Sequence, residues 1–171
     1  SFRIGWKDSK NMIKVLIITC SDSDLPVMSE ASKVLEEFGI EYKMTISSAH
    51  RSPDRTEELI VDASTSGVKV IIAGAGMAAH LAGAIASRFT LPVIGVPLES
   101  GVLGGVDALL STMQMPPGIP VATVAINGAK NAGILAVQIL AISDKNLEEK
   151  LIEYKKKLAE GVGEKAYKFE R

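Results

Sequence analysis

The sequence is poor in several features that mark specialised classes of protein. It has one cysteine in 171 residues, Cys20, which excludes an internal disulfide and a zinc site built on cysteines. Lysine and arginine total 19 against 20 aspartates and glutamates, so the basic excess of nucleic-acid and membrane-surface binders is missing. No run approaches the ~18 apolar residues of a membrane helix, and residues 1–11 lack the apolar stretch of a secretory signal. These absences predict a cytoplasmic protein that binds neither nucleic acid nor membrane.

The composition that remains is that of one globular domain. Hydrophobic residues make up 47% and charged residues 23%, and a chain of 171 residues can bury a full core. We assign residues 12–143 to a single domain and residues 144–171 to a C-terminal helical arm and tail. Residues 1–11, which precede Met12, are interpreted as an N-terminal extension or a vector-derived remnant.

Apolar runs of strand length alternate with helical patterns along the domain. Strands are predicted at residues 14–19, 40–46, 68–73, 92–96 and 121–126, and helices at residues 26–38, 53–64, 77–89, 105–113 and 129–142. This alternation indicates right-handed βαβ units, hence a parallel sheet with helices on both faces. Five strands favour the flavodoxin-like three-layer α/β fold, with strand order 2-1-3-4-5, over a barrel, which needs eight strands.

A further helix is expected after the sheet is complete. Its narrow apolar stripe, on an otherwise charged segment, consists of Leu147, Leu151, Tyr154 and Leu158. The stripe fits a solvated helix lying on its own domain, but its place after the last strand favours an arm that packs on a neighbouring subunit. We expect residues 161–171 to fray.

Three predicted strand ends carry clusters of small and polar residues. The clusters span residues 20–24, 47–53 and 73–81, and they contain both histidines of the chain, His50 and His80. Ligands of open parallel sheets bind beyond the carboxyl ends of the strands. The convergence of the clusters therefore predicts a ligand site at this edge.

The first cluster suits an anion. The hydroxyls of Ser21 and Ser23, with the amides of a turn that leads into a helix, can hold a phosphate. Asp24 can accept hydrogen bonds from ribose hydroxyls. The spacing matches neither a P-loop nor GxGxxG. Simple capping of the following helix explains the same three residues.

The other two clusters supply a cation and two imidazoles. Arg51 can clamp a phosphate with Ser48 beside it, although a lone loop arginine is more often a plain surface residue. His50 belongs to the residue type that titrates nearest neutrality and is the obvious proton shuttle. The Gly/Ala-rich third cluster can approach a flat ligand closely, and His80 either contacts that ligand or holds a helix start. Two histidines in separate loops do not resemble a metal site.

The clusters resemble the motifs of one enzyme family. Residues 20–24 read CSDSD where the family has GSxSD, residues 48–53 read SAHRSP for SAHRTP, and residues 73–83 read AGAGMAAHLAG for AGAGGAAHLPG. GVP, QMPPGIPVATVAI and NA follow in order at residues 95–97, 114–126 and 131–132. On these motifs the chain resembles the class I N5-carboxyaminoimidazole ribonucleotide mutases of purine biosynthesis, also called phosphoribosylaminoimidazole carboxylase catalytic subunits. The animal-type class II carboxylases lack the histidine of the third motif.

The resemblance implies a flavodoxin-like subunit of a cytoplasmic homo-octamer, with no metal or organic cofactor. The implied reaction moves a carboxylate, by way of CO2, from the exocyclic amine to C4 of an imidazole ribonucleotide. His50 would be the general acid–base and Asp24 would hold the ribose. Phosphate ligands would be Ser21, Ser48 and Arg51. The other implied substrate-binding residues are Ser23, Ala49, Ala73, Gly74, Ala75, Gly76, His80, Leu81, Gln114 and Met115, the last two from a neighbouring subunit.

The chain departs from the family pattern at three positions. Cys20 and Met77 replace glycines and Ala82 replaces a proline, and none of these changes removes a functional group. They do alter two segments: the turn that would contact the phosphate, and the loop around His80. Two alternatives stay open: a direct carboxylase of aminoimidazole ribonucleotide that uses CO2, and a catalytically impaired homologue acting as a nucleotide-binding or assembly subunit.

Overall fold

The computed structural model describes residues 12–169, so the predicted N-terminal extension lies outside the described residues. Its strands are β1 (Val15–Thr19), β2 (Tyr42–Ile46), β3 (Val70–Gly76), β4 (Val93–Leu98) and β5 (Ala122–Thr123). Its α-helices are α1 (Leu25–Phe38), α2 (Pro53–Thr65), α3 (Leu81–Ala86), α4 (Val106–Met113), α5 (Ala129–Ala141) and α6 (Lys145–Phe169). Two 3-10 turns, η1 (Asp22–Asp24) and η2 (Gly101–Leu103), precede α1 and α4.

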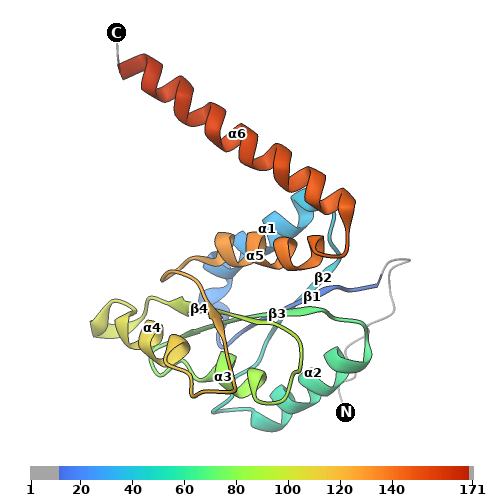
Figure 1. Ribbon diagram of the computed structural model, residues 1–171. Helices are drawn as coiled ribbons and strands as arrows, with labels where there is room; N and C mark the ends of the chain where they lie inside the picture. Colours follow the sequence, from blue (N-terminus) through green and yellow to red (C-terminus); the bar gives the residue numbers. More distant parts are fainter. Residues whose placement is uncertain (1–11, 170–171) are drawn as a thin grey trace.

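The five strands form one parallel sheet in the order β2-β1-β3-β4-β5, which confirms the predicted flavodoxin-like topology. Helices α1 and α5 lie on one side of the sheet, and α2 and α3 lie on the other (Figure 1). Two buried clusters follow from this layering. Ile17 and Ile72 point into the cluster under α1 and α5, whereas Leu16 and Ile71 point into the other cluster. Alternate residues of the central strands thus face opposite layers, which is why those strands are apolar throughout.

Two elements are much shorter than the sequence pattern predicts. Strand β5 has two residues, and beyond it the chain touches β4 through two separate bonds, from the Val124 N–H to the Gly95 carbonyl at 3.1 Å and from the Asn127 N–H, where φ is 58°, to the Pro97 carbonyl at 2.8 Å. Helix α3 begins at Leu81 because Met77 has a φ of 55°, a left-handed conformation that a right-handed helix cannot contain. The first turn predicted for this helix is therefore a loop beside the sheet edge.

Helix α6 divides into a docked half and a projecting half (Figure 1). Leu147 and Leu151 are buried in the core, and the Tyr154 ring packs edge-on against Phe38 with 5.7 Å between ring centroids. Leu158 is 54% exposed. The helix is continuous to Phe169 across most of the segment expected to fray, and that expectation stays a prediction. No helix within residues 12–169 is long and apolar enough to cross a membrane.

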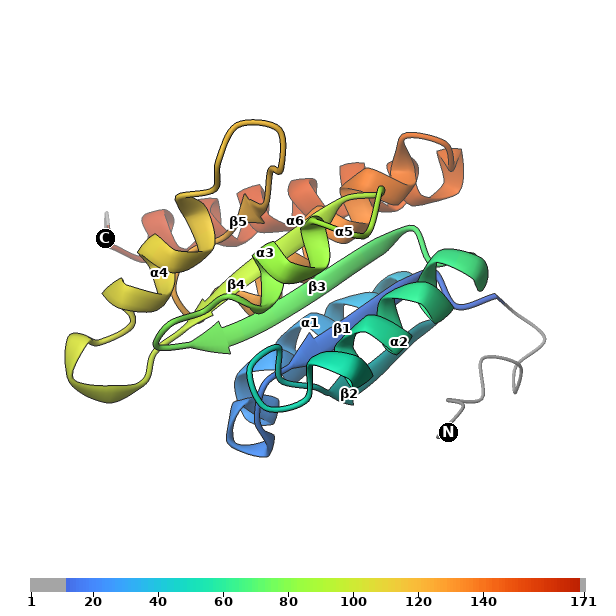
Figure 2. The same cartoon turned by 90° about the horizontal axis from the view of Figure 1, so that it is seen from below.

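The register of the central strands sets the level at which the loops begin. Thr19 pairs with Ile46 of β2 and with Gly74 of β3, so the chain leaves these strands at one edge. Figure 2 shows β1, β3 and β4 pointing toward the same end of the molecule. The three clusters predicted to bind a ligand therefore meet there.

Candidate active site

Two adjoining hollows lie at the carboxyl edge of the sheet. The smaller, of about 280 Å³, is lined by Cys20 after β1, by residues 48–51 after β2, and by residues 75–78, 80 and 81 at the end of β3. The larger, of about 520 Å³, is lined by residues 20–22, 46–48, 51 and 52. Cys20, Ser48 and Arg51 line both hollows. A ligand with an anionic end and a flat ring can therefore span them, with Arg51 in between.

Arg51 ties two of the loops together. Its backbone N–H donates to Ser48 Oγ at 3.2 Å, and its Nη2 donates to the carbonyl oxygen of Cys20 at 3.2 Å. A guanidinium has five N–H donors, so this contact leaves most of the fork for a ligand. The guanidinium is thereby held in one orientation, as a bidentate anion clamp requires.

A network of hydroxyls holds the loop that carries Arg51. Ser52 Oγ accepts from the Ser48 N–H at 3.1 Å and donates to the Ser48 carbonyl at 3.1 Å. Beneath it, Ser47 Oγ and Thr56 Oγ1 share a buried hydrogen bond of 2.8 Å. The loop is thus shaped by its own residues and by the first turn of α2. Side-chain order of this kind reduces the entropy lost when a ligand binds.

In the first cluster Ser21 caps the 3-10 turn η1, whereas the N-cap residue of α1, Asp24, makes no side-chain capping bond, so the capping interpretation is confirmed only for the short turn. Ser21 Oγ accepts from the Ser23 N–H at 3.3 Å and lies 2.9 Å from Ser23 Oγ. Asp24 instead accepts from Thr19 Oγ1 at 3.2 Å. Ser21 lines the larger hollow, whereas Ser23 and Asp24 line neither.

The two histidines are in direct contact. His50 Nε2 lies 2.9 Å from His80 Nδ1, and the rings stand at 85° with centroids 5.0 Å apart. A hydrogen bond between imidazole nitrogens needs one donor and one acceptor, so the pair holds one proton on the line between the rings. Each ring fixes the orientation of the other, which the sequence did not predict.

Besides Ser23 and Asp24, four of the predicted substrate-binding residues lie away from both hollows. Ala73 and Gly74 are inside β3, and the Gly74 backbone faces the buried Met28 thioether. Gln114 follows α4 and is exposed, and the Met115 thioether lies against Gly83 of α3. Their roles stay predictions.

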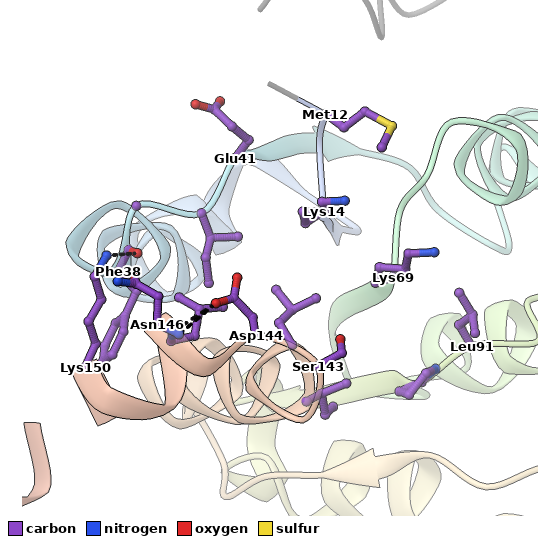
Figure 3. A pocket seen from close by; sticks show the side chains of 16 residues that line it. Met12, Lys14, Phe38, Glu41, Lys69, Leu91, Ser143, Asp144, Asn146 and Lys150 are labelled. Atoms are coloured by element: carbon purple, nitrogen blue, oxygen red, sulfur yellow. Dashed lines mark hydrogen bonds between the residues drawn. The ribbon is translucent and has the colours of Figure 1, made fainter. Parts of the chain in front are cut away.

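A larger hollow, of about 840 Å³, lies at the amino ends of β1, β3 and β4 (Figure 3). Two of its polar groups serve the fold: Lys150 Nζ donates to the Phe38 carbonyl at 3.0 Å, and Asp144 Oδ1 accepts from the Asn146 N–H at 3.0 Å to cap α6. It contains neither histidine and none of the three clusters. Size therefore does not identify the active site, and the carboxyl edge remains the candidate.

The sequence of the whole domain matches one known family. The profile described as AIR carboxylase covers residues 14–161, which includes all three clusters. The chain belongs to the AIR carboxylase family. No group of three metal-ligating side chains gathers anywhere within residues 12–169.

Relatives within the AIR carboxylase family carry two different names. The N5-carboxyaminoimidazole ribonucleotide mutase of Thermotoga maritima is 56% identical over 160 residues, 94% of each chain. The phosphoribosylaminoimidazole carboxylase of Saccharomyces cerevisiae is 51% identical over 165 residues, which cover 95% of this chain and 29% of the yeast protein. The crystal structure of Treponema denticola PurE superposes with a TM-score of 0.84 at 29% identity, covering 92% of this chain and 98% of that one.

Three residues of the smaller hollow are absent from the predicted binding residues. Cys20, Met77 and Ala78 line the smaller hollow beside the histidines. Each lies within one of the clusters, so position in the motif was the available signal. Their side chains carry no obvious ligand-binding group, which is why residue type alone did not select them.

Burial and nearby charges set the ionisation of Cys20 and Asp24. Burial raises the pKa of the Cys20 thiol above its ordinary value, the charge of Asp24 raises it further, and Arg51 lowers it. Burial also raises the pKa of the Asp24 carboxyl, while hydrogen bonds from Thr19 and Ser21 oppose that change. The Cys20 side chain is thus a neutral thiol at neutral pH.

We expect iodoacetamide to alkylate Cys20 more slowly than free cysteine at neutral pH, because the raised pKa leaves less thiolate. The rate should go on rising at pH values where that of free cysteine has levelled off. Asp24→Asn removes a charge that raises the pKa, so it should speed the reaction at neutral pH, unlike the control Asp107→Asn on α4. Mass spectrometry of the intact chain measures this directly, since Cys20 is the single cysteine. Equal rates for both variants would contradict the placement of Asp24.

Proposed function

We propose that this chain is an N5-carboxyaminoimidazole ribonucleotide mutase of purine biosynthesis. It moves the carboxylate of the substrate from the exocyclic amine to C4 of the imidazole ring. The observation that carries the proposal is the position of His50, which adjoins the anion clamp Arg51 and contacts His80 in the wall of one hollow. The high identity to a relative of that name over 94% of each chain supports it.

The ribonucleotide lies across the two hollows in this proposal. Its phosphate occupies the larger hollow, where Ser21 and Ser48 flank the Arg51 guanidinium. The ribose is assigned to Asp24 by the family resemblance, although Asp24 lines neither hollow. The imidazole ring lies in the smaller hollow against Ala75 and the adjacent backbone, where small side chains leave room for a flat ring. Fixing the phosphate therefore fixes the ring relative to His50.

One histidine can serve both proton transfers of the reaction. The N–C bond of the carbamate breaks, its electron pair stays on nitrogen, and that nitrogen takes a proton from His50 as CO2 is released. The ring is now an electron-rich enamine, and C4 attacks the CO2 carbon. C4 then carries both the new carboxylate and its original hydrogen. His50 removes that proton, which restores the aromatic ring and returns the histidine to its starting state.

His80 has a supporting part in this scheme. Its Nδ1 lies 2.9 Å from His50 Nε2, so it orients the His50 ring and determines which nitrogen of that ring carries the proton. Orientation of a general base by a second group is the usual arrangement in proton-transfer sites. His80 can also contact the migrating carboxylate from the same wall of the hollow.

The experiment that tests the function is a comparison of two substrate mixtures. The purified chain should convert N5-carboxyaminoimidazole ribonucleotide to 4-carboxy-5-aminoimidazole ribonucleotide without added bicarbonate. Product formed only from aminoimidazole ribonucleotide and bicarbonate would instead favour the direct carboxylase, to which the 51% identity with the yeast carboxylase points. No product from either mixture, with nucleotide still bound, would favour the impaired homologue.

His50→Asn is expected to lower turnover by about 10²–10⁴-fold, because a positioned acid–base typically contributes that much. The affinity for aminoimidazole ribonucleotide should be kept, since the phosphate and ribose contacts are untouched. His80→Asn should lower turnover less than His50→Asn does, because the His50 imidazole remains. Turnover and calorimetric affinity of the two variants are measured side by side. A deeper loss in folded His80→Asn would reverse the two roles.

Arg51→Ala should weaken the binding of aminoimidazole ribonucleotide roughly tenfold or more, because a charge-assisted contact contributes about 1.5–3 kcal/mol. Titration calorimetry at fixed salt measures the affinity. Arg88→Ala is the matched control, since Arg88 pairs with Glu57 on an exposed surface and lines neither hollow. Unchanged affinity in Arg51→Ala would move the phosphate elsewhere.

The proposal includes an octameric, cytosolic enzyme that releases CO2 only transiently. The projecting half of α6 supports assembly, because Leu158 continues the apolar stripe beyond the docked residues Leu147 and Leu151. In the assembly, Gln114 and Met115 from a neighbouring subunit would complete the hollows that they do not reach within their own chain. The single cysteine agrees with a reducing compartment.

Light scattering at micromolar concentration should give a mass near eight times the 18.1 kDa chain. Leu158→Glu should reduce that mass, because it places a charge on the apolar stripe of the projecting half. Lys157→Glu, one residue away on the charged face, is the control and should not reduce it. A stable wild-type monomer would contradict the octamer.

A further inference from the structure

The loop between β3 and α3 contains one strained residue. Met77 has a φ of 55°, and Asn127 is the one other residue besides glycine with a positive φ within residues 12–169. L-residues with bulky side chains rarely adopt this conformation. Strain of this kind persists where the surrounding structure imposes it, and it concentrates at functional sites.

The residues on both sides of Met77 impose its conformation. A Cβ atom on Gly76 would lie 2.9 Å from Ser100 Cβ, so the backbone is pressed against the end of β4. Ala79 is buried, and the His80 N–H donates to the Ala78 carbonyl at 2.9 Å. Because Gly76 is held on one side and Ala79 on the other, the chain changes direction at Met77 and Ala78. The direction of the Met77 side chain is therefore set by the backbone.

That direction places Met77 at the mouth of the smaller hollow. It lines the hollow together with His50 and His80, yet it is 59% exposed. Leu81 lines the same hollow from within and is buried. The other residues of this loop are Ala78, Ala79 and His80, so Met77 is the one large apolar side chain that the loop places beside the hollow.

A thioether at that position can affect access but not proton transfer. It neither donates nor accepts a proton at neutral pH, and its three rotatable bonds let it adapt to a bound ring. The related motif AGAGGAAHLPG has glycine here, so the reaction itself does not require the side chain. The Met77 side chain can therefore affect only which molecules enter or leave the smaller hollow.

We propose that Met77 is a gate residue that restricts the escape of CO2 from the smaller hollow to solvent. This role rests on the proposed mutase function. After the carbamate N–C bond breaks, CO2 has two fates: C4 attacks it and His50 takes the C4 proton, or it leaves and free aminoimidazole ribonucleotide remains. Met77 lowers the rate of the second fate. It thereby favours the carbamate as carboxylate source over CO2 dissolved in solvent.

The test follows the labelled carboxylate through one turnover. Enzyme in excess is mixed with N5-carboxyaminoimidazole ribonucleotide carrying ¹³C in the carbamate, in unlabelled bicarbonate, and a blank without enzyme corrects for spontaneous decay. Mass spectrometry gives the ratio of labelled product to unlabelled product plus free aminoimidazole ribonucleotide. Because this ratio compares two fates of one intermediate, changes in the rate of the steps that precede CO2 release cancel.

Met77→Ala should lower the ratio several-fold, and Met77→Gly should lower it as much. Met77→Leu, which keeps an apolar side chain of similar size, should retain the wild-type ratio. Met77→Gly should also melt at a higher temperature than Met77→Ala, because glycine relieves the strained φ. Val61→Ala, which trims an apolar side chain of similar exposure (57%) on α2, is the control and should leave the ratio unchanged.

The outcomes separate this role from the function on which it rests. Wild-type ratios in Met77→Ala and Met77→Gly would overturn the gate and leave the mutase function standing. A fall of the ratio in Met77→Leu as large as in Met77→Ala would also overturn the gate, because any apolar side chain of that size should restrict CO2 escape. A wild-type chain that forms no carboxylated product would overturn the mutase function and the gate with it.

Discussion

The placement of β1 between β2 and β3 is the constraint on which the rest of the site depends. Thr19 pairs with Ile46 on one side and with Gly74 on the other, so two neighbouring strands end level and the third continues to Gly76. Hydrogen-bonded strands lie about 4.8 Å apart. The loops that follow therefore begin within reach of one another. A register shift of one residue would turn the buried side chains of a strand to the opposite layers.

Given that register, few polar contacts are needed to shape the site. The side chain of Arg51 reaches the Cys20 carbonyl across the two loops, and Ser52 closes the Arg51 loop on the Ser48 backbone. Within residues 12–169, no buried side-chain nitrogen or oxygen lacks a hydrogen-bond partner. The buried polar side chains are thus paired within the chain itself.

The departures from the family motifs are related in space. Cys20 and Met77 come from different clusters, yet both line the smaller hollow with the histidines. Ala82, the third departure, is buried in α3 behind the same loop. A glycine replaced by a larger residue narrows a cavity without adding a charge. Their common location indicates that this chain differs from the motif in the shape of its cavity, while His50, His80 and Arg51 are those of the motif.

Local patterns in the sequence determined the strand and helix types, the parallel topology and the family, because continuous apolar runs and glycine-rich strand ends reflect burial and close approach within a few residues. The predicted element boundaries were wrong where tertiary contacts set them, at the edge strand β5 and at the strained Met77 before α3. The His50–His80 hydrogen bond was not predictable, since it joins residues 30 positions apart whose separation depends on strand order and loop dihedrals together. The same holds for α6: its stripe is periodic throughout, but only the packing of Leu151 and the exposure of Leu158 show where the domain surface ends.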